Sequence, residues 1–147
     1  MSESKYAASF RDLIVYQKAR QASREIFQLT SRFPKEEAFS LTDQIRRSSR
    51  SVGAQIAEAW SKRKYEKHFA SKLTDADGEQ QETQHRIETA LDCCYLTPQE
   101  TDSLLKQYAE IGRLLGGMLA KADQFCNPAR YHIRELQAEY IASNPDE

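Results

Sequence analysis

QIRRSSRSVGAQIAEAW, residues 44–60, contains the pattern that decides the fold. Ile45, Ser49, Val52 and Ile56 follow one another at helical intervals of three or four residues. At about 100° per residue, the last three side chains fall within about 40° of Ile45, on one face of an α-helix. Small or apolar residues at this spacing, close to a heptad repeat, are typical of a helix that packs against a core. The segment is therefore predicted to be an amphipathic helix.

The arginines of the same segment fall on the opposite face. Arg46, Arg47 and Arg50 lie at about 100°, about 200° and about 140° from the first core position. Four small residues share this outward arc: Gly53, Ala54, Ala57 and Ser61. Small side chains let another helix or a nucleic-acid backbone come close. The outward face is therefore predicted to combine positive charge with room for a partner.

The rest of the chain shows the same helical periodicity, without sustained strand-like alternation. We expect helices over about residues 11–32, from a start between 35 and 40 to about 61, over about 65–94 and over about 98–125. Ser9 and Asp12 have the spacing of an N-terminal capping box. Thr97 and Glu100 have the same spacing, with a proline at the first helical position. Four such helices with short loops predict an all-α, antiparallel up-down four-helix bundle over residues 10–126.

The inward positions of the other three helices follow from the same spacing. On the first helix they are Leu13, Tyr16, Ala19, Ile26, Leu29 or Thr30, and Phe33. On the third they are Phe69, Leu73, Ala76, Gln80, Thr83, Ile87, Ala90 or Leu91, and Cys94. On the fourth they are Leu104, Leu105, Tyr108, Ile111, Leu115, Met118 or Leu119, Ala122 and Phe125. The middle of the third helix is polar for a core, so we expect that seam to meet solvent or another subunit.

Two terminal segments fall outside the predicted bundle. Residues 1–9 are polar and are expected to be disordered or frayed. Residues 127–147 are expected to form a short C-terminal helix and tail, in which Tyr131, Leu136 and Tyr140 share one face. The sequence pattern is equally compatible with a segment that docks on a partner and with a partly ordered tail that has no function.

Composition excludes several classes of protein. The 147 residues include 21 basic and 22 acidic side chains, for a net charge of −1. The whole molecule therefore does not attract nucleic acid or anionic lipid, and an electrostatic partner must recognise a local patch. No apolar stretch is long enough to cross a bilayer, and no signal segment is evident, so we expect a soluble, cytoplasmic protein without a membrane partner. Cys93, Cys94 and Cys126 lack a C-x-x-C spacing and are expected to be reduced and structural.

Charge is distributed unevenly along the chain. Residues 44–72 hold eight basic residues against two acidic ones, whereas the rest of the third helix, residues 73–94, holds six acidic residues opposed only by Arg86. Arginine binds phosphate through paired hydrogen bonds, and Tyr65, His68 or Phe69 could stack on unpaired bases. This pattern favours an RNA or DNA partner. The predicted nucleic-acid-binding residues are Arg46, Arg47, Arg50, Lys62, Arg63, Lys64 and Lys67.

A second interpretation assigns the same basic surface to assembly. The arginines would then pair with acidic residues of a neighbouring subunit or a protein partner, such as Glu79, Glu82 or Glu88. In either case we expect no enzyme. The chain has no nucleophile motif, glycine-rich phosphate loop or repeated metal-ligand spacing, and its histidines are isolated. No catalytic residue, metal or cofactor is therefore predicted.

Three stretches carry a family resemblance: FRDLIVYQKA at residues 10–19, LTSRFPKEEAFSLTDQIRRSSRSVGAQIAEAWSKR at residues 29–63 and ADGEQQET at residues 76–83. In this order they resemble the bacterial four-helix-bundle family of proteins encoded in intervening sequences of 23S ribosomal RNA. The same family includes accessory proteins of diversity-generating retroelements, which resemble pentameric bundles that bind nucleic acid and a reverse transcriptase.

The resemblance implies a homo-oligomer, with a pentamer around a central channel favoured. Four positions of its most characteristic segment are carried over as family-motif or interface residues: Gln44, Ser51, Ala57 and Glu58. The chain departs from the family pattern at Gln55, where asparagine is usual, and at Glu79, where serine often stands. These departures bear on the interface and the ligand rather than on the fold.

Overall fold

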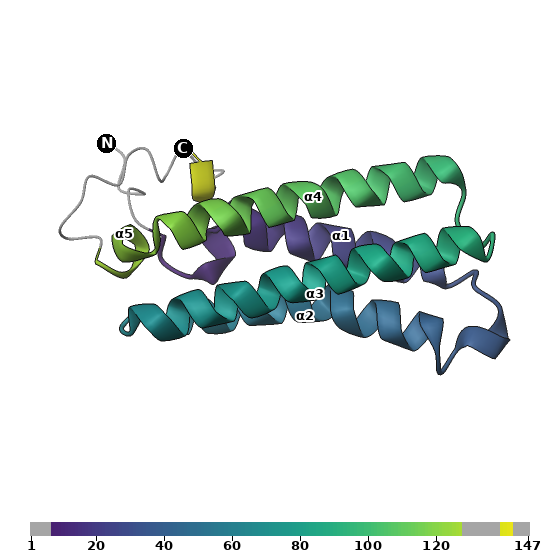
Figure 1. Ribbon diagram of the computed structural model, residues 1–147, viewed down its shortest axis with the longest axis horizontal. Coiled ribbons are helices and arrows are strands. Elements are labelled where there is room, and N and C mark those ends of the chain that lie inside the picture. The colour runs from purple at the N-terminus through teal and green to yellow at the C-terminus, as the bar shows by residue number, and fades with distance from the viewer. Residues whose placement is uncertain (1–6, 128–138, 143–147) are drawn as a thin grey trace.

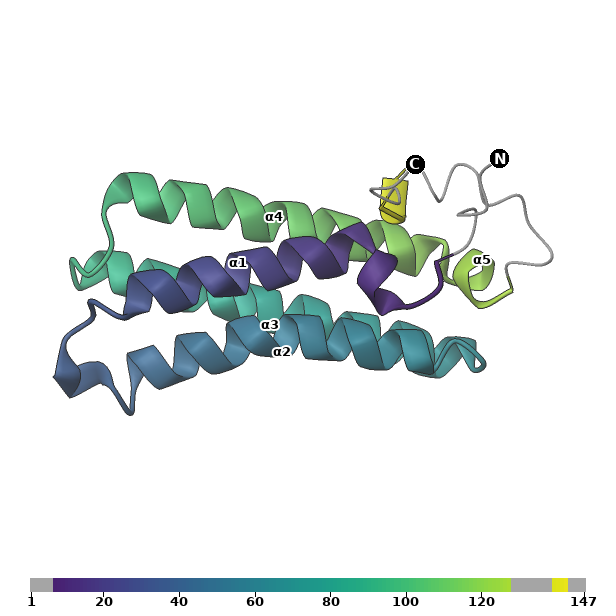
Figure 2. The same ribbon diagram turned by 180° about the vertical axis from the view of Figure 1, so that it is seen from behind.

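The computed structural model describes residues 7–127 and 139–142, and four long helices dominate it (Figure 1). The elements are η1 (Phe10–Asp12), α1 (Ile14–Thr30), η2 (Lys35–Glu37), α2 (Leu41–Ser61), α3 (Glu66–Asp92), α4 (Pro98–Ala120) and α5 (Ala122–Cys126). Consecutive long helices run in opposite directions, and the view from behind shows the same arrangement (Figure 2). Helix α2 packs against α1 and α3, and α4 packs against the same two helices. The predicted up-down four-helix bundle is confirmed.

The core of the bundle contains the predicted stripe of α2. Ile45, Ser49, Val52 and Ile56 are each at most 1% exposed. Ser48 is also buried, which the helical angle alone did not single out. Burial of each large apolar side chain contributes roughly 1.5–3 kcal/mol. Helix α2 is therefore held in place by its apolar face, which leaves its outward face free to vary.

A polar layer crosses the core between α2 and α3. The Thr83 hydroxyl donates to the Ser48 hydroxyl at 2.8 Å, and both residues are buried. Gln80 is 4% exposed, and its side chain pairs with Asp77 at 2.9 Å and with Gln84 at 2.6 Å. The expectation that this seam meets solvent or another subunit is therefore wrong. The buried side chains of Ser48, Gln80 and Thr83 each find a hydrogen-bond partner within the chain, which offsets the cost of their burial.

The first predicted helix is interrupted near its start. Ser9 and Asp12 form the expected capping box, but it closes only the short 3₁₀ turn η1. Leu13 is extended, at φ −77° and ψ 129°, and forms an isolated β-bridge with Ile141. Helix α1 begins one residue later. Tyr16, an expected core residue, is half-buried, whereas Val15 is buried in its place.

The other helix ends differ from expectation in three places. Helix α2 begins at Leu41, after the 3₁₀ turn η2, and not between residues 35 and 40. Thr97 and Glu100 form the predicted capping box at the start of α4. That helix ends at Ala120 and a separate short helix follows, so the single helix expected to reach residue 125 is divided. Helix α3 ends before Cys94, which is exposed and has a positive φ of 63°. Cys94 is therefore a turn residue and was wrongly placed in the core.

The described part of the C-terminal segment packs on the bundle. Tyr140 is 4% exposed, and its ring lies edge-on to Phe125 at 5.6 Å between centroids. An added Cβ at Gly117 would overlap the Tyr140 hydroxyl, so this close approach needs glycine. Tyr131 and Leu136, the other residues of the predicted tail helix, lie outside the described residues.

Candidate functional site

The outward face of α2 lies between two grooves. The α2–α3 groove has a volume of about 510 Å³. It is lined by Gln44, Arg47, Ser48, Arg50, Ser51 and Ala54 of α2 and by Glu79, Glu82 and Arg86 of α3. The α1–α2 groove, of about 210 Å³, includes Tyr16, Gly53 and Ala57. Arg50 and Ala54 line both grooves, so this part of α2 forms a ridge between them.

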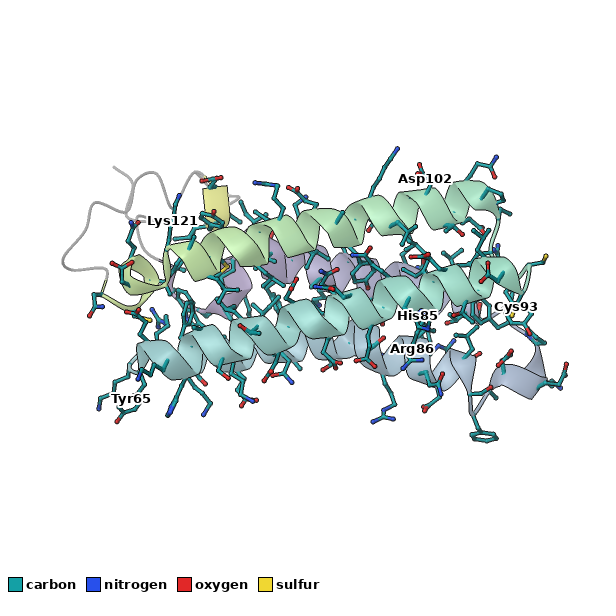
Figure 3. The ribbon with its side chains drawn as sticks, in the orientation of Figure 1. Tyr65, His85, Arg86, Cys93, Asp102 and Lys121 are labelled. Carbon is teal, nitrogen blue, oxygen red and sulfur yellow. The ribbon has the colours of Figure 1, made fainter. Side chains whose placement is uncertain are left out.

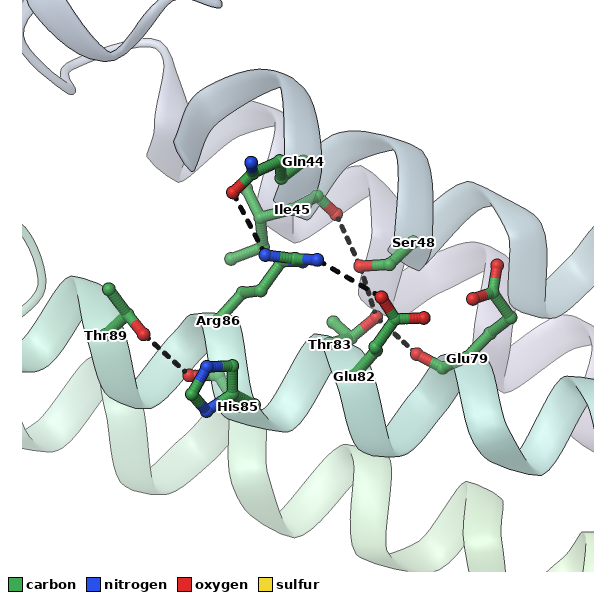
Figure 4. A network of polar contacts seen from close by, with 9 residues as sticks. All are labelled: Gln44, Ile45, Ser48, Glu79, Glu82, Thr83, His85, Arg86 and Thr89. Atoms are coloured by element: carbon green, nitrogen blue, oxygen red, sulfur yellow. Dashed lines mark hydrogen bonds and ion pairs between the residues drawn. The ribbon is translucent and has the colours of Figure 1, made fainter. Parts of the chain in front are cut away.

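Arg86 connects the two walls of the α2–α3 groove (Figure 4). Its Nη1 donates to Oε1 of Gln44 at 3.0 Å, and its Nη2 donates to Oε1 of Glu82 at 3.1 Å. Its Nε is buried without a hydrogen-bond partner. Arg86, the only arginine or lysine in residues 73–92 of α3, therefore belongs to the site, although no sequence pattern placed it opposite Gln44.

Two carboxyl groups meet on the α3 wall of this groove. Burial and a hydrogen bond with Glu82 raise the pKa of Glu79, while Ser51 and Arg47 act in the opposite direction. Hydrogen bonds from Glu79 and Arg86 lower the pKa of Glu82. The two carboxyl groups therefore share a proton at pH values below the raised pKa of Glu79. The acidic wall is less negative there than two separate carboxylates would be.

Arg46 was expected on the outward face of α2, but it is half-buried and contacts α1. Its Nε donates to the Thr30 hydroxyl at 2.8 Å, and its Nη2 donates to the Phe27 carbonyl at 3.3 Å. The guanidinium lies over the Phe27 ring, 4.6 Å from its centroid. Phe27 belongs to the last turn of α1, where carbonyls lack a backbone N–H partner within the helix, and its carbonyl also accepts from the Thr30 hydroxyl at 3.2 Å. Arg46 joins α2 to α1 and is not a free binding group.

Arg47 and Arg50 occupy the outward face as predicted. Both are exposed, and in the part of the chain that the structure describes neither forms an ion pair. Arg50 lies over the exposed Phe27 ring at 5.6 Å, and Arg47 is close enough to Glu79 to affect its pKa. Their donors point to solvent-accessible space and remain available for a ligand.

The basic corner between α2 and α3 divides in a similar way. The Nε of Arg63 donates to the Trp60 carbonyl at 2.9 Å, and its guanidinium lies 3.6 Å from the Trp60 ring centroid. Arg63 therefore closes the C-terminus of α2. Lys62 is half-buried, whereas Lys64 and Lys67 are exposed. The ammonium group of Lys64 lies 6.0 Å from the centroid of the exposed Tyr65 ring, so the charge of both exposed lysines stays accessible to solvent.

The aromatic residues of the corner also separate into two classes. Tyr65 is 58% exposed and lies at the opposite end of the bundle from Cys93 (Figure 3). His68 is exposed beside it, with 5.4 Å between the ring centroids. Phe69 is fully buried and cannot stack on a base, contrary to expectation. The corner and Arg50 are about 18 Å apart along α2, so the predicted basic residues form a line rather than one cluster.

The carried-over family positions lie along the same face of α2. Gln44 and Ser51 line the α2–α3 groove, and Ala57 lines the α1–α2 groove. Glu58 pairs with Lys72 of α3 at 3.2 Å. Among the described residues, no three histidine, cysteine or acidic side chains are grouped so that they could hold a metal ion. No helix in the described ranges is long and apolar enough to cross a membrane.

Comparison with known proteins identifies the family. The family model described as 23S rRNA-intervening sequence protein matches residues 11–117, which include α1, α2 and α3 and all but the last three residues of α4. The chain belongs to the 23S rRNA-intervening sequence protein family. A solved structure of a protein with unknown function from the S23 ribosomal protein family of Bacteroides thetaiotaomicron is 29% identical, with a TM-score of 0.66. The match covers 73% of this chain and 96% of that chain.

No curated protein matches this chain at a significant level. Membership in the 23S rRNA-intervening sequence protein family confirms the resemblance seen in the sequence. The matched range includes both walls of the α2–α3 groove.

Proposed function

We propose that this member of the 23S rRNA-intervening sequence protein family is a non-enzymatic protein that binds structured RNA through the outward face of α2. One observation carries the proposal: Arg47 and Arg50 are exposed on the same face of α2 and form no ion pair with residues 7–127 or 139–142, although Glu79 and Glu82 line the same groove. Guanidinium groups in this state can each give two hydrogen bonds to a phosphate. The half-buried Arg46 supports the fold instead.

The basic corner between α2 and α3 extends the proposed contact along α2. Lys64 and Lys67 are exposed at this corner, about 18 Å from Arg50 along α2, and Tyr65 offers a ring for an unpaired base at the same end. Phosphate contacts of this kind do not depend on base sequence and weaken as salt rises. A helical RNA stem with a loop satisfies both features.

The assembly interpretation has less support from the described contacts. It assigns Glu79 and Glu82 to pairing with the arginines of a neighbour. Glu82 already pairs with Arg86 of its own chain, and Glu79 lies within the same groove as Arg47. Assembly into a homo-oligomer, with five subunits favoured by the family resemblance, stays a prediction that light scattering after size exclusion can test.

The experiment is a fluorescence anisotropy titration of a labelled RNA hairpin at low salt. Arg47→Ala with Arg50→Ala is expected to weaken binding about tenfold or more, because two phosphate contacts are lost. The matched control, Lys106→Ala with Arg113→Ala, removes the same charge from α4, which packs against α1 and α3 rather than α2. Equal affinity of the two double variants would overturn the proposal.

The same titration separates the two interpretations. If the α2 arginines serve assembly, their removal should dissociate the oligomer and leave the RNA affinity of the remaining species unchanged. Light scattering on the same samples reads the first result and anisotropy reads the second. An intact assembly with lost RNA affinity supports the nucleic-acid interface.

A further inference from the structure

The α2–α3 groove places two carboxyl groups within the proposed RNA-binding face. Glu79 and Glu82 line it together with Arg47, and the Glu82 side chain is 51% exposed. A phosphate held in this groove would meet negative charge on the α3 wall. The groove is therefore poorly suited to phosphate beside the carboxyl pair, and a phosphate is expected to meet the exposed side chains of Arg47 and Arg50 at its rim. Its own ligand must supply hydrogen-bond donors.

The two walls of the groove offer complementary groups. The α3 wall presents carboxylate oxygens, which accept hydrogen bonds. The α2 wall presents the Arg47 guanidinium, which only donates, and the Ser51 hydroxyl, which can do either. Between them lie the small side chains of Ser48 and Ala54, and the volume of about 510 Å³ has room for a planar ring. A planar ligand that fits both walls has hydrogen-bond donors on the edge that faces α3 and hydrogen-bond acceptors on the adjacent edge that faces Arg47.

Guanine is the RNA base with this arrangement. Its N1–H and its N2 amino group are adjacent donors, and its O6 and N7 are adjacent acceptors. Adenine and cytosine each place a ring-nitrogen acceptor beside the amino group, and uracil flanks its N3–H with carbonyl oxygens. In those three bases one acceptor would face a carboxylate.

We propose that the α2–α3 groove binds one unpaired guanine of the RNA. The carboxyl pair of Glu79 and Glu82 accepts from N1–H and the N2 amino group. Arg47 donates to O6 or N7 through one of its five N–H donors and keeps the others for a phosphate. Arg86 holds Glu82 in position through its hydrogen bond and fixes the α2 wall through Gln44. This inference rests on the proposed function and adds base selectivity to it: phosphate contacts of Arg47, Arg50 and the exposed lysines supply affinity, and the carboxyl pair of the groove selects the base.

The test compares hairpins that share one stem and differ at a single unpaired loop base. Guanine, inosine and adenine are placed there, and affinity is measured by anisotropy. The guanine loop is expected to bind roughly tenfold more tightly than the adenine loop, as a good paired base contact does. Inosine keeps N1–H, O6 and N7 but lacks the N2 amino group, so its affinity should fall between the two.

Glu82→Gln identifies the groove as the source of the selectivity. This variant removes a carboxylate from the groove, so the adenine-to-guanine ratio of dissociation constants should fall toward one. Glu88→Gln is the matched control, because it removes the same charge from an exposed position of α3 outside the groove and should keep the ratio. The ratio is the readout because either variant can strengthen binding to all RNA by removing negative charge.

The outcomes separate this inference from the proposed function. Equal affinity for all three loops, with the effect of the α2 arginines retained, overturns the guanine site and leaves RNA binding intact. Selectivity that survives Glu82→Gln also overturns it. Failure to bind any hairpin overturns both proposals and directs the search toward a protein ligand for the groove.

Discussion

Arg46→Ala tests whether the basic residues of α2 divide between structure and binding. The substitution removes the hydrogen bonds at 2.8 Å to Thr30 and at 3.3 Å to the Phe27 carbonyl, together with the stacking on the Phe27 ring. The Thr30 hydroxyl still donates to the Ile26 carbonyl at 2.7 Å, and water can reach the Phe27 carbonyl. The loss is therefore at the low end for charged hydrogen bonds, about 1–2 kcal/mol in the free energy of unfolding.

Thermal unfolding followed by circular dichroism measures this loss. For a chain of this size, about 1–2 kcal/mol lowers Tm by roughly 2–8 °C. Arg47→Ala, one residue along, is the matched control and should change stability by no more than about 0.5 kcal/mol, because that side chain is exposed and makes no hydrogen bond in the described part of the chain. RNA affinity should show the reverse order, with the larger effect from Arg47→Ala. The reasoning is refuted if Arg46→Ala is as stable as the unmodified protein and loses RNA affinity to the same extent as Arg47→Ala.

Three further predictions test the surrounding structure. Thr83→Val should lower the free energy of unfolding by about 1–2 kcal/mol, measured by urea denaturation. Adding Ser48→Ala to this variant should recover part of the loss, because the unpaired serine hydroxyl is then removed as well. Gly117→Ala should cost about 1–3 kcal/mol in the same assay, because the new methyl group overlaps Tyr140; a comparable cost in a Tyr140→Ala background would contradict this packing. The hydrogen bond with Arg32 is the main cause that lowers the pKa of Glu100. The ionised Glu100 therefore contributes to stability above about pH 4.3, and this contribution is lost as pH falls through the lowered pKa. Glu100→Gln should flatten this acid-side decline, and an unchanged pH profile of stability would count against the contact.

The local features of the fold could be predicted because they depend on residues close in sequence. The α2 stripe from Ile45 to Ile56 follows from helical spacing, and the start of α4 follows from the Thr97 capping box. The break at Leu13 could not be predicted in this way, because the extended backbone there pairs with Ile141 at the far end of the chain. A capping box marks where a helical turn starts but does not say how long the helix continues.

The candidate site was only half visible in the sequence. A helical angle placed Arg47 correctly on the outward face, but it misplaced Arg46, whose long side chain reaches across to α1. The contact between Arg86 and Gln44 spans 42 positions and depends on the register of two antiparallel helices. Hydrophobic periodicity identifies the faces of these helices and not their register. The groove therefore appears only once the bundle is assembled.

The salt dependence of RNA affinity tests the central claim most directly. A plot of log Kd against log salt concentration for the unmodified protein should have a steep slope, set by the number of phosphate contacts. For Arg47→Ala with Arg50→Ala the slope should decrease by about two, one for each arginine that no longer meets a phosphate. The α4 control variant, Lys106→Ala with Arg113→Ala, should keep the original slope. An unchanged slope in the α2 variant would contradict phosphate binding by the outward face of α2.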